Sequence, residues 1–325
     1  MYNIITVGDA TLDIFITIDK SSSQCHVDKK KEYLSLAYGD KIYASDIHQA
    51  VGGNAANVAV GLAKTGHSVA ILSQLGNDKQ AEAIIDALIA RGVQTNHIIQ
   101  KKKEVTRTSC IINYAAERTV LSYHASRTYA LGTLPKTEWI YATSMGKGFE
   151  KTYKQILSYK KNQPHSNIAF NPGSYQLSHA VKEIRQFLSV VDVLFVNKEE
   201  AQQIIGKKIS NHKTMLHSLQ KEYAIPYIVL TDGAQGSYAL YNEQAYHMPI
   251  YPLPPLSKTG AGDAYASGFL TALLAKKDVP TCMQWGSANA CAVTQHHGAQ
   301  EGLSTKKQLQ QFIKTYPSII ATSLS

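Results

Sequence analysis

Short hydrophobic runs alternate with longer stretches of helical periodicity along most of the chain. Residues 4–7 are a β-branched run that ends at Gly8, which is typical of a buried strand followed by a turn. Further strands are predicted at 68–72, 139–141, 168–170, 193–196 and 228–230. Helices are predicted after Gly52-Gly53, over 80–91 and over 303–315. Such alternation predicts a parallel sheet that is covered by helices on both faces.

Two segments depart from this alternation and predict a small β appendage. The first starts with a strand-like run at 14–18, and its residues 21–32 are polar and basic, which predicts an exposed loop. In the second, β-rich runs flank polar residues and predict a hairpin. We therefore expect one α/β domain over residues 1–325, with an appendage built from about 14–50 and 105–125.

Composition narrows the class of protein. Hydrophobic residues make up 44% and charged residues 18% of 325 residues, which is ordinary for a globular chain with a sizeable core. The N-terminus has no signal-peptide pattern, and no apolar run approaches the roughly 20 residues that span a bilayer. The cysteines are far apart and form no C-x-x-C pair, so a cytoplasmic protein is expected. They are Cys25, Cys110, Cys282 and Cys291.

The charge balance is basic, with 33 Lys and Arg against 24 Asp and Glu, a net charge of +9. Such an excess raises the question of nucleic acid or acidic lipid as a partner. The basic residues show no aromatic interleaving and no nucleic-acid motif, so no nucleic-acid partner is expected. Part of the excess lies in the lysine triplets 29–31 and 101–103, which is compatible with attracting an anionic nucleotide.

The densest chemical signal is the glycine-rich turn Thr-Gly-Ala-Gly-Asp at residues 259–263, directly before a predicted helix. Free backbone N–H groups and the positive end of the helix dipole suit an anion there. Asp263, in the first turn, is placed to accept a proton from an attacking hydroxyl, as in phosphoryl transfer. In isolation such a motif favours a plain tight turn with a stabilising acidic residue.

A second motif, Gly-Gly-Asn-Ala-Ala-Asn-Val-Ala-Val-Gly at residues 52–61, shows that the turn is not isolated. The two motifs together resemble the signature regions of the PfkB, or ribokinase-like, carbohydrate kinase family, and matching elements follow in family order from Gly8 to Gly302. The resemblance implies a three-layer α/β/α sandwich with a mostly parallel sheet and a small β-sheet lid. It also implies an ATP-dependent kinase for a hydroxyl of a small sugar, with Mg²⁺ as cofactor.

The resemblance assigns the chemistry to particular residues. Asp263 matches the catalytic base, and the backbone amides of Gly260, Ala261 and Gly262 match the anion hole. The positions that match the sugar-binding carboxylate and the substrate loop are Asp13, Gly52, Gly53, Asn54 and Asn57. Strand ends are where open α/β sheets bind ligands, and Asn side chains both donate to and accept from vicinal hydroxyls. Asp9, close to Asp13, is interpreted as a turn-forming residue.

Two later motifs match the nucleotide side of the family's site. In Asn-Lys-Glu-Glu at 197–200, Asn197 is implied to help bind phosphate and Glu200 to help hold Mg²⁺, largely through water. The simpler reading of these acids is a favourable first helical turn. The remaining nucleotide-binding matches are Thr231, Gly233, Gly236 and Asn289. For these the alternatives are a plain turn and an ordinary polar helix position.

One departure concerns monovalent cations. Ser257 stands where ribokinase-type members have a carboxylate that helps form a cation site, and Lys258 adds a positive charge beside it. This substitution removes the basis for expecting potassium activation. In the lid, the resemblance implies a cover over the sugar that often also forms a homodimer surface. Three of its polar residues are candidates to reach the sugar, namely Arg107, Asn113 and Arg127.

Several other functions are weighed against the sugar kinase. A nucleoside kinase of the adenosine type is the main alternative, because the same scaffold serves both acceptors. A catalytically weak sugar-binding regulator is disfavoured by the intact base and anion hole. The chain has no P-loop motif, no dinucleotide fingerprint after its first strand and no H-E-x-x-H zinc motif. A sugar or nucleoside and ATP are thus the expected partners, without a membrane.

Overall fold

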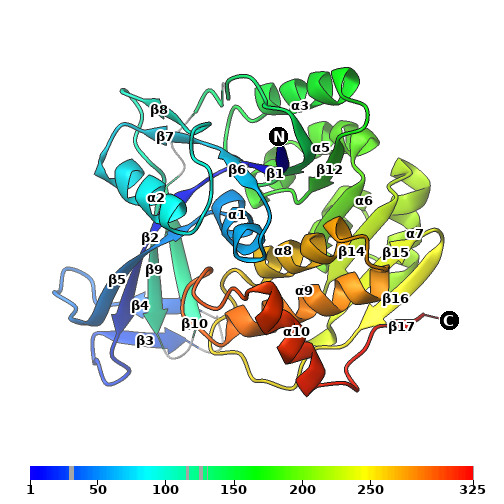
Figure 1. Cartoon of the computed structure of the whole chain (residues 1–325). Coiled ribbons are helices and arrows are strands. Elements are labelled where there is room, and N and C mark those ends of the chain that lie inside the picture. Colours follow the sequence, from blue (N-terminus) through cyan, green and yellow to red (C-terminus); the bar gives the residue numbers. More distant parts are fainter. Residues whose placement is uncertain (29–32, 115–116, 124–126, 130, 325) are drawn as a thin grey trace.

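A nine-stranded sheet runs through the middle of the molecule in the order β17-β16-β15-β14-β13-β12-β11-β1-β6 (Figure 1). The computed structural model describes all residues except 29–32, 115–116, 124–126, 130 and 325. The strands from β6 to β14 are parallel, as the sequence predicts. They are β6 (Val69–Leu72), β1 (Tyr2–Val7), β11 (Thr137–Ala142), β12 (Asn167–Phe170), β13 (Val193–Asn197) and β14 (Tyr227–Thr231).

The other edge of this sheet is antiparallel and was not predicted from the sequence. It consists of β15 (Ser237–Tyr241), β16 (Gln244–Met248) and the short β17 (Thr322–Ser323). The hairpin between β15 and β16 turns through Asn242 and Glu243, whose φ angles are 47° and 64°. Two successive residues at positive φ are typical of a tight hairpin turn, which Asn favours more than most residues.

Helices cover both faces of the sheet, which confirms the predicted three-layer sandwich. Neighbouring residues of β1 point to opposite sides, so that Ile4 joins one buried cluster and Ile5 the other. The first cluster is completed by α1 (Asn54–Lys64), α2 (Lys79–Ala90), α8 (Ala261–Leu274), α9 (Val279–Thr294) and α10 (Lys306–Thr315). The second is completed by α3 (Glu150–Asn162), α4 (Ser174–His179), α5 (Val181–Phe187), α6 (Lys198–Ile205) and α7 (His212–Tyr223).

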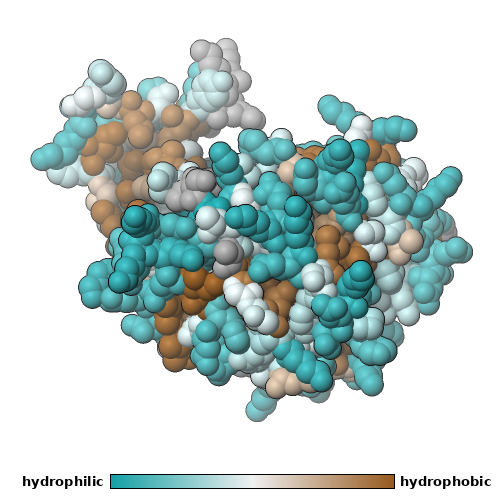
Figure 2. Space-filling model, turned by 90° about the horizontal axis from the view of Figure 1, so that it is seen from above, coloured by the Kyte–Doolittle hydropathy of each residue, from teal (hydrophilic) through white to brown (hydrophobic). Residues whose placement is uncertain are grey.

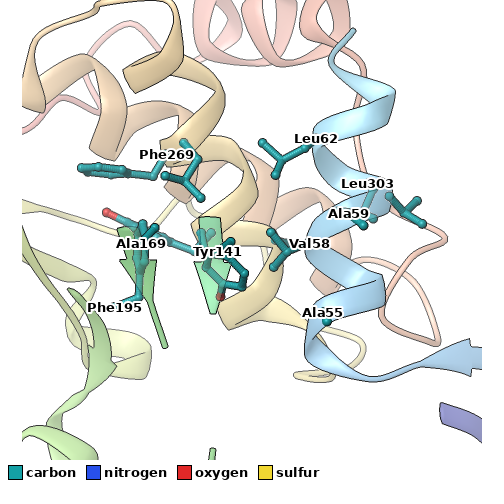
Figure 3. Packing of buried hydrophobic residues seen from close by; sticks show 14 of the residues in the cluster. Ala55, Val58, Ala59, Leu62, Tyr141, Ala169, Phe195, Phe269 and Leu303 are labelled. Atoms are coloured by element: carbon teal, nitrogen blue, oxygen red, sulfur yellow. The ribbon is translucent and has the colours of Figure 1, made fainter. Parts of the chain in front are cut away.

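Helices α1 and α8 lie side by side over the sheet, and this contact brings the two sequence motifs together. Val58 and Leu62 point from α1 toward α8, above the sheet residues Tyr141, Ala169 and Phe195 (Figure 3). Gly61 permits the close approach, because a Cβ there would overlap the Ser267 hydroxyl of α8. The N-termini of both helices consequently lie close together, and Asn54 of α1 contacts Asp263 of α8.

A second, four-stranded sheet has the order β10-β9-β2-β5 and extends from the sandwich (Figure 1). Its strands are β2 (Thr11–Ile18), β5 (Ala44–Gly52), β9 (Thr108–Tyr114) and β10 (Glu117–Ser122). Strands β9 and β10 pair as the predicted hairpin; its turn, 115–116, lies outside the described residues. The second sheet confirms the expected small β-sheet, and one more parallel pair joins β7 (Gln74–Gly76) to β8 (Ile99–Lys101).

The expected exposed loop at 21–32 was wrong in part. Residues Cys25–Asp28 form β3, which pairs with β4 (Tyr33–Leu36). Cys25 is only 2% exposed and anchors β3 through its buried thiol. The polar residues around Cys25 are the reason why the sequence did not predict this strand. The lysine triplet at 29–31 lies outside the described residues. Within the described part of the chain, no helix is long and apolar enough to cross a membrane.

Candidate active site

The glycine-rich turn forms the N-terminus of α8, where Gly260 is the cap residue with φ 75°. A Cβ on Gly260 would lie 2.5 Å from the Cβ of Ala299, so this position requires glycine for its conformation and for its packing. Gly262 faces open space instead. The turn lines a pocket of about 200 Å³ that several other motif residues also line. Those residues are Asn54, Asn197, Glu200, Thr231 and Asp263.

Asp263 is 6% exposed and is held by two amide groups from α1. Asn54 Nδ2 donates to Asp263 Oδ1 at 3.0 Å, and Asn57 Nδ2 donates to Asp263 Oδ2 at 2.8 Å. Burial raises the pKa of Asp263 to about 7, against the lowering effect of the two hydrogen bonds, and the negative charge of Glu200 raises it further. Asp263 is thus a poised proton acceptor at neutral pH.

Asn197 and Glu200 satisfy each other in a capping box at the start of α6. Glu200 N donates to Asn197 Oδ1 at 2.8 Å, and Asn197 N donates to Glu200 Oε2 at 2.9 Å. Burial raises the pKa of Glu200 to about 7, partly offset by the Asn197 amide. The helix-end reading of this motif is therefore correct, and both residues line the pocket as well.

No group of three or more His, Cys, Asp or Glu among the described residues is placed to hold a metal ion. A site in which protein side chains alone complete the coordination does not fit these residues. Mg²⁺ that is held mainly by phosphate oxygens and water needs only one or two carboxylates. Glu200, which faces the pocket beside the α8 N-terminus, fits that kind of site.

A larger pocket of about 430 Å³ adjoins the first and shares Thr231, Lys258, Ala261, Gly262 and Tyr265 with it. Gly233 and Gly236 line it from the loop after β14, and Gly236 has φ 82° with a Cβ position that Met248 O occupies. The rest of its lining is mostly apolar and includes Ile250, Leu253, Pro255, Ala290 and Cys291. Such a lining suits a flat, weakly polar group.

Asn289 is not among the described residues that line either pocket. It is fully buried, and its Nδ2 donates to Ala264 O at 2.9 Å and to Ser267 Oγ at 3.1 Å. Its Oδ1 accepts from Ser304 N at 3.0 Å. The helix was expected to border the nucleotide pocket, and α9 does so through other residues, while Asn289 ties α9 to α8.

Asp13 packs against Gly52, and the backbone of Asp9 against Gly53, at the base of the second sheet. A Cβ on Gly52 would overlap Asp13 Oδ2, and a Cβ on Gly53, whose φ is 88°, would lie 2.5 Å from Asp9 O. Thr11 Oγ1 donates to Asp13 Oδ1 at 3.1 Å, and burial raises the pKa of Asp13. Asp13 does not line the two described pockets, but it contacts Gly52 at the end of β5, two residues before Asn54.

Asp9 is a buried ion-pair partner and not a turn-forming side chain. It pairs with Arg107 Nη1 and lies 3.7 Å from Arg127 Nη1, and Tyr129 OH donates to it at 2.8 Å. Both arginines are less than 10% exposed, and their guanidinium groups face Asp9 inside the protein. Their pKa values are lowered by burial. Of the three lid candidates, only Asn113 stays on the lid, in β9.

Ser257, which stands where ribokinase-type members have a carboxylate, closes a short turn with its hydroxyl group. Ser257 Oγ accepts from Thr259 N at 3.2 Å and bonds Thr259 Oγ1 at 3.2 Å. Lys258 is exposed. Both Lys258 and the buried Tyr265 line the two pockets. Tyr265 and Asn171, which lines the smaller pocket, were not selected from the sequence, although Tyr265 lies only two residues after Asp263.

Comparison with known proteins places this site in a family. Residues 20–306 match the pfkB family carbohydrate kinases. The chain belongs to this family. It is 22% identical over 322 residues to a ribokinase of Bacillus subtilis, covering 96% of this chain and 100% of the relative. It is also 29% identical over 238 residues to a fructokinase of Escherichia coli, covering 68% of this chain and 76% of that protein.

Solved structures agree on the fold of this kinase. An archaeal nucleoside kinase from Methanocaldococcus jannaschii superposes with a TM-score of 0.78 at 21% identity, covering 97% of this chain and 99% of the other. Arabidopsis thaliana ribokinase, solved with ribose and ATP, has a TM-score of 0.79 at 18% identity, with coverage of 96% and 99%. The pfkB chain is therefore a phosphotransferase with an alcohol group as acceptor, on a ribokinase-like fold.

Proposed function

We propose that this pfkB kinase transfers the γ-phosphate of ATP to a hydroxyl of a small sugar. The observation that carries the proposal is the shared pocket in which the buried carboxylate of Asp263 meets the N-terminus of α8. A base and an anion-binding helix end in one pocket are the two elements that phosphoryl transfer requires from a protein.

In this proposal Asp263 accepts the proton of the attacking sugar hydroxyl. Asn54 and Asn57 orient the carboxylate in the free protein, as their bonds of 3.0 and 2.8 Å indicate. The backbone amides of residues 260–262 stabilise the negative charge that develops on the transferred group, aided by the helix dipole. Asp13, with Gly52 and Gly53 behind it, binds other hydroxyls of the sugar.

The proposed nucleotide position is the larger pocket. Its apolar walls suit a purine ring, and the loop with Thr231, Gly233 and Gly236 allows close backbone approach to ribose or phosphate. Asn197 and Glu200 lie on the side of the γ-phosphate and would hold Mg²⁺ through water. When bound, Mg²⁺ supplies positive charge that neutralises the phosphate oxygens.

We also propose that the second sheet serves as a lid over the acceptor. Asp13 on β2 is paired with Ala50 on β5 and Ser109 on β9, so one face of this sheet is turned toward the substrate loop. A cover of this kind excludes water, which otherwise competes as the phosphate acceptor.

The direct test is a panel of sugars and nucleosides, each incubated with Mg-ATP and followed by ADP release. We expect ADP above the no-acceptor background with only a few sugars. Release with adenosine or another nucleoside alone would replace the sugar acceptor by a nucleoside, the acceptor of the archaeal neighbour. Binding of sugars without any ADP release would contradict a kinase and support a binding protein.

A further inference from the structure

Gln300 lies behind the proposed base, on the far side of Asn57. Its side chain is 4% exposed, and its Nε2 donates to Asn57 Oδ1 at 2.9 Å. Asn57 is itself 5% exposed, and its Nδ2 donates to Asp263 Oδ2 at 2.8 Å. Three buried side chains from three separate parts of the chain thus form one hydrogen-bonded row.

The direction of this row is determined by its carboxylate end. An ionised carboxylate only accepts hydrogen bonds, so Asn57 must present its NH₂ group to Asp263. Asn57 Oδ1 then faces Gln300, which must present its own NH₂ group in turn. Reversing the Gln300 amide would set two carbonyl oxygens against each other at 2.9 Å, which is electrostatically unfavourable.

This orientation of the Gln300 amide leaves its carbonyl oxygen, Oε1, buried and without a hydrogen-bond partner among the described residues. A buried unpaired acceptor is unfavourable, so the amide is held in this orientation against a penalty. The neighbouring Ala299 also packs directly on Gly260, which places the segment 299–300 against both the α8 N-terminus and Asn57.

We propose that Gln300 is a positioning residue that fixes the amide of Asn57 and, through it, the carboxylate of Asp263. This inference rests on the proposed role of Asp263 as the base. Gln300 does not touch the reacting atoms; it acts only by holding the Asn57 donor toward the carboxylate. Without it, the Asn57 side chain is free to rotate and Asp263 loses one of its two anchors.

The test is a double-mutant cycle with Gln300→Met and Asn57→Ala, assayed with an acceptor from the panel. Gln300→Met keeps the length of the side chain and removes the donor. We expect kcat to fall about ten-fold while KM for ATP stays within two-fold. Because Gln300 acts through Asn57, the double variant should lose no more than Asn57→Ala alone. The matched control is Gln310→Met on the exposed face of α10.

Two results would overturn the inference: a kcat for Gln300→Met equal to that of wild type, or losses in the two single variants that multiply in the double variant. If Gln300→Met fails to fold, Gln300→Leu replaces it, because leucine is apolar, fits a buried position and has no N–H donor. Asp263→Asn is assayed in parallel. Substantial turnover there refutes the proposed base, whereas loss there with a silent Gln300 variant refutes only the positioning role.

Discussion

At the scale of single residues, two carboxylates in one pocket carry the electrostatics of the site. Burial raises the pKa values of both Asp263 and Glu200 to about 7, and the charge of Glu200 adds to the effect on Asp263. The sequence motifs identified both residues, but not how deeply their carboxyl groups are buried. The pKa values come from the packing of α1, α6 and α8 around the pocket.

The raised pKa of Asp263 predicts the pH dependence of the reaction. A base accepts a proton only when it is ionised, so the reaction speeds up as the pH rises through its pKa. We expect kcat/KM, which reports on the free enzyme, to fall about ten-fold per pH unit below about pH 7. An acid limb near pH 4, the range of an unperturbed Asp, would contradict the burial of this group.

Asn289 is a matched motif residue whose contacts in the structure are all internal, so its nucleotide role stays a prediction. Its three hydrogen bonds connect α9 to α8 and to Ser304. We expect Asn289→Ala to lower the free energy of unfolding by about 2 kcal/mol, because buried donors and acceptors lose their partner. KM for ATP should stay within two-fold of wild type. A large rise in this KM in a variant of unchanged stability would support the nucleotide role.

For Asp9, Arg107 and Arg127 too, the sequence did not show which contacts the side chains make. Their residue types and spacing were compatible with an exposed turn and with sugar contacts. In the structure, residues almost 100 positions apart meet in a buried ion pair at the base of the lid. Which of several charged residues find each other across the fold depends on tertiary packing, so no local pattern distinguishes a ligand contact from an internal one.

At the scale of elements, the helix ends matter most. Gly260 and Gly262 are both small, but only Gly260 has positive φ and a Cβ position blocked by Ala299. We expect Gly260→Ala to lower both the melting temperature and turnover, because the turn must shift. Gly262→Ala should melt like wild type and still lose turnover about 10²-fold or more, because its Cβ enters the anion-binding space. Equal melting temperatures for the two variants would contradict the distinction.

Elements with an uninterrupted apolar run or a strong helical period were predictable, including the four-residue strands β6 and β12. The parallel strands and α1, α2 and α10 appear within a few residues of their predicted positions, because their apolar residues recur with the period of the element. Strands β3, β15 and β16 have four or five residues and polar or aromatic neighbours. Their pairing partners, not their own patterns, make them strands.

At the scale of the whole molecule, the lid sheet has two unlike faces. The face that carries Asp13 is turned to the substrate loop, whereas Ile14, Ile16, Ile47 and Leu121 point to the opposite side by strand alternation. Ile47 is 63% exposed and Leu121 56%. Figure 2 shows hydrophobic surface gathered at the left, where Figure 1 places this sheet.

An apolar sheet face of this kind predicts self-association, and we propose that the chain forms a homodimer through it. Light scattering should give twice the mass of a single chain. Ile47→Lys should shift the protein toward the monomer, whereas Ile320→Lys, at another exposed position before β17, should leave it dimeric. A wild-type monomer at micromolar concentration would contradict the dimer without affecting the proposed chemistry.

The central claim, that Asp263 is the base of a phosphoryl transfer, is tested most directly by Asp263→Asn. Turnover of this variant and of the exposed control Asp86→Asn is measured with Mg-ATP and the acceptor found in the panel, and acceptor binding is measured by calorimetry. We predict a loss of turnover of about 10²–10⁴-fold for Asp263→Asn, acceptor affinity within a few-fold of wild type, and normal turnover for the control. Near-normal turnover of a folded Asp263→Asn variant would contradict the account.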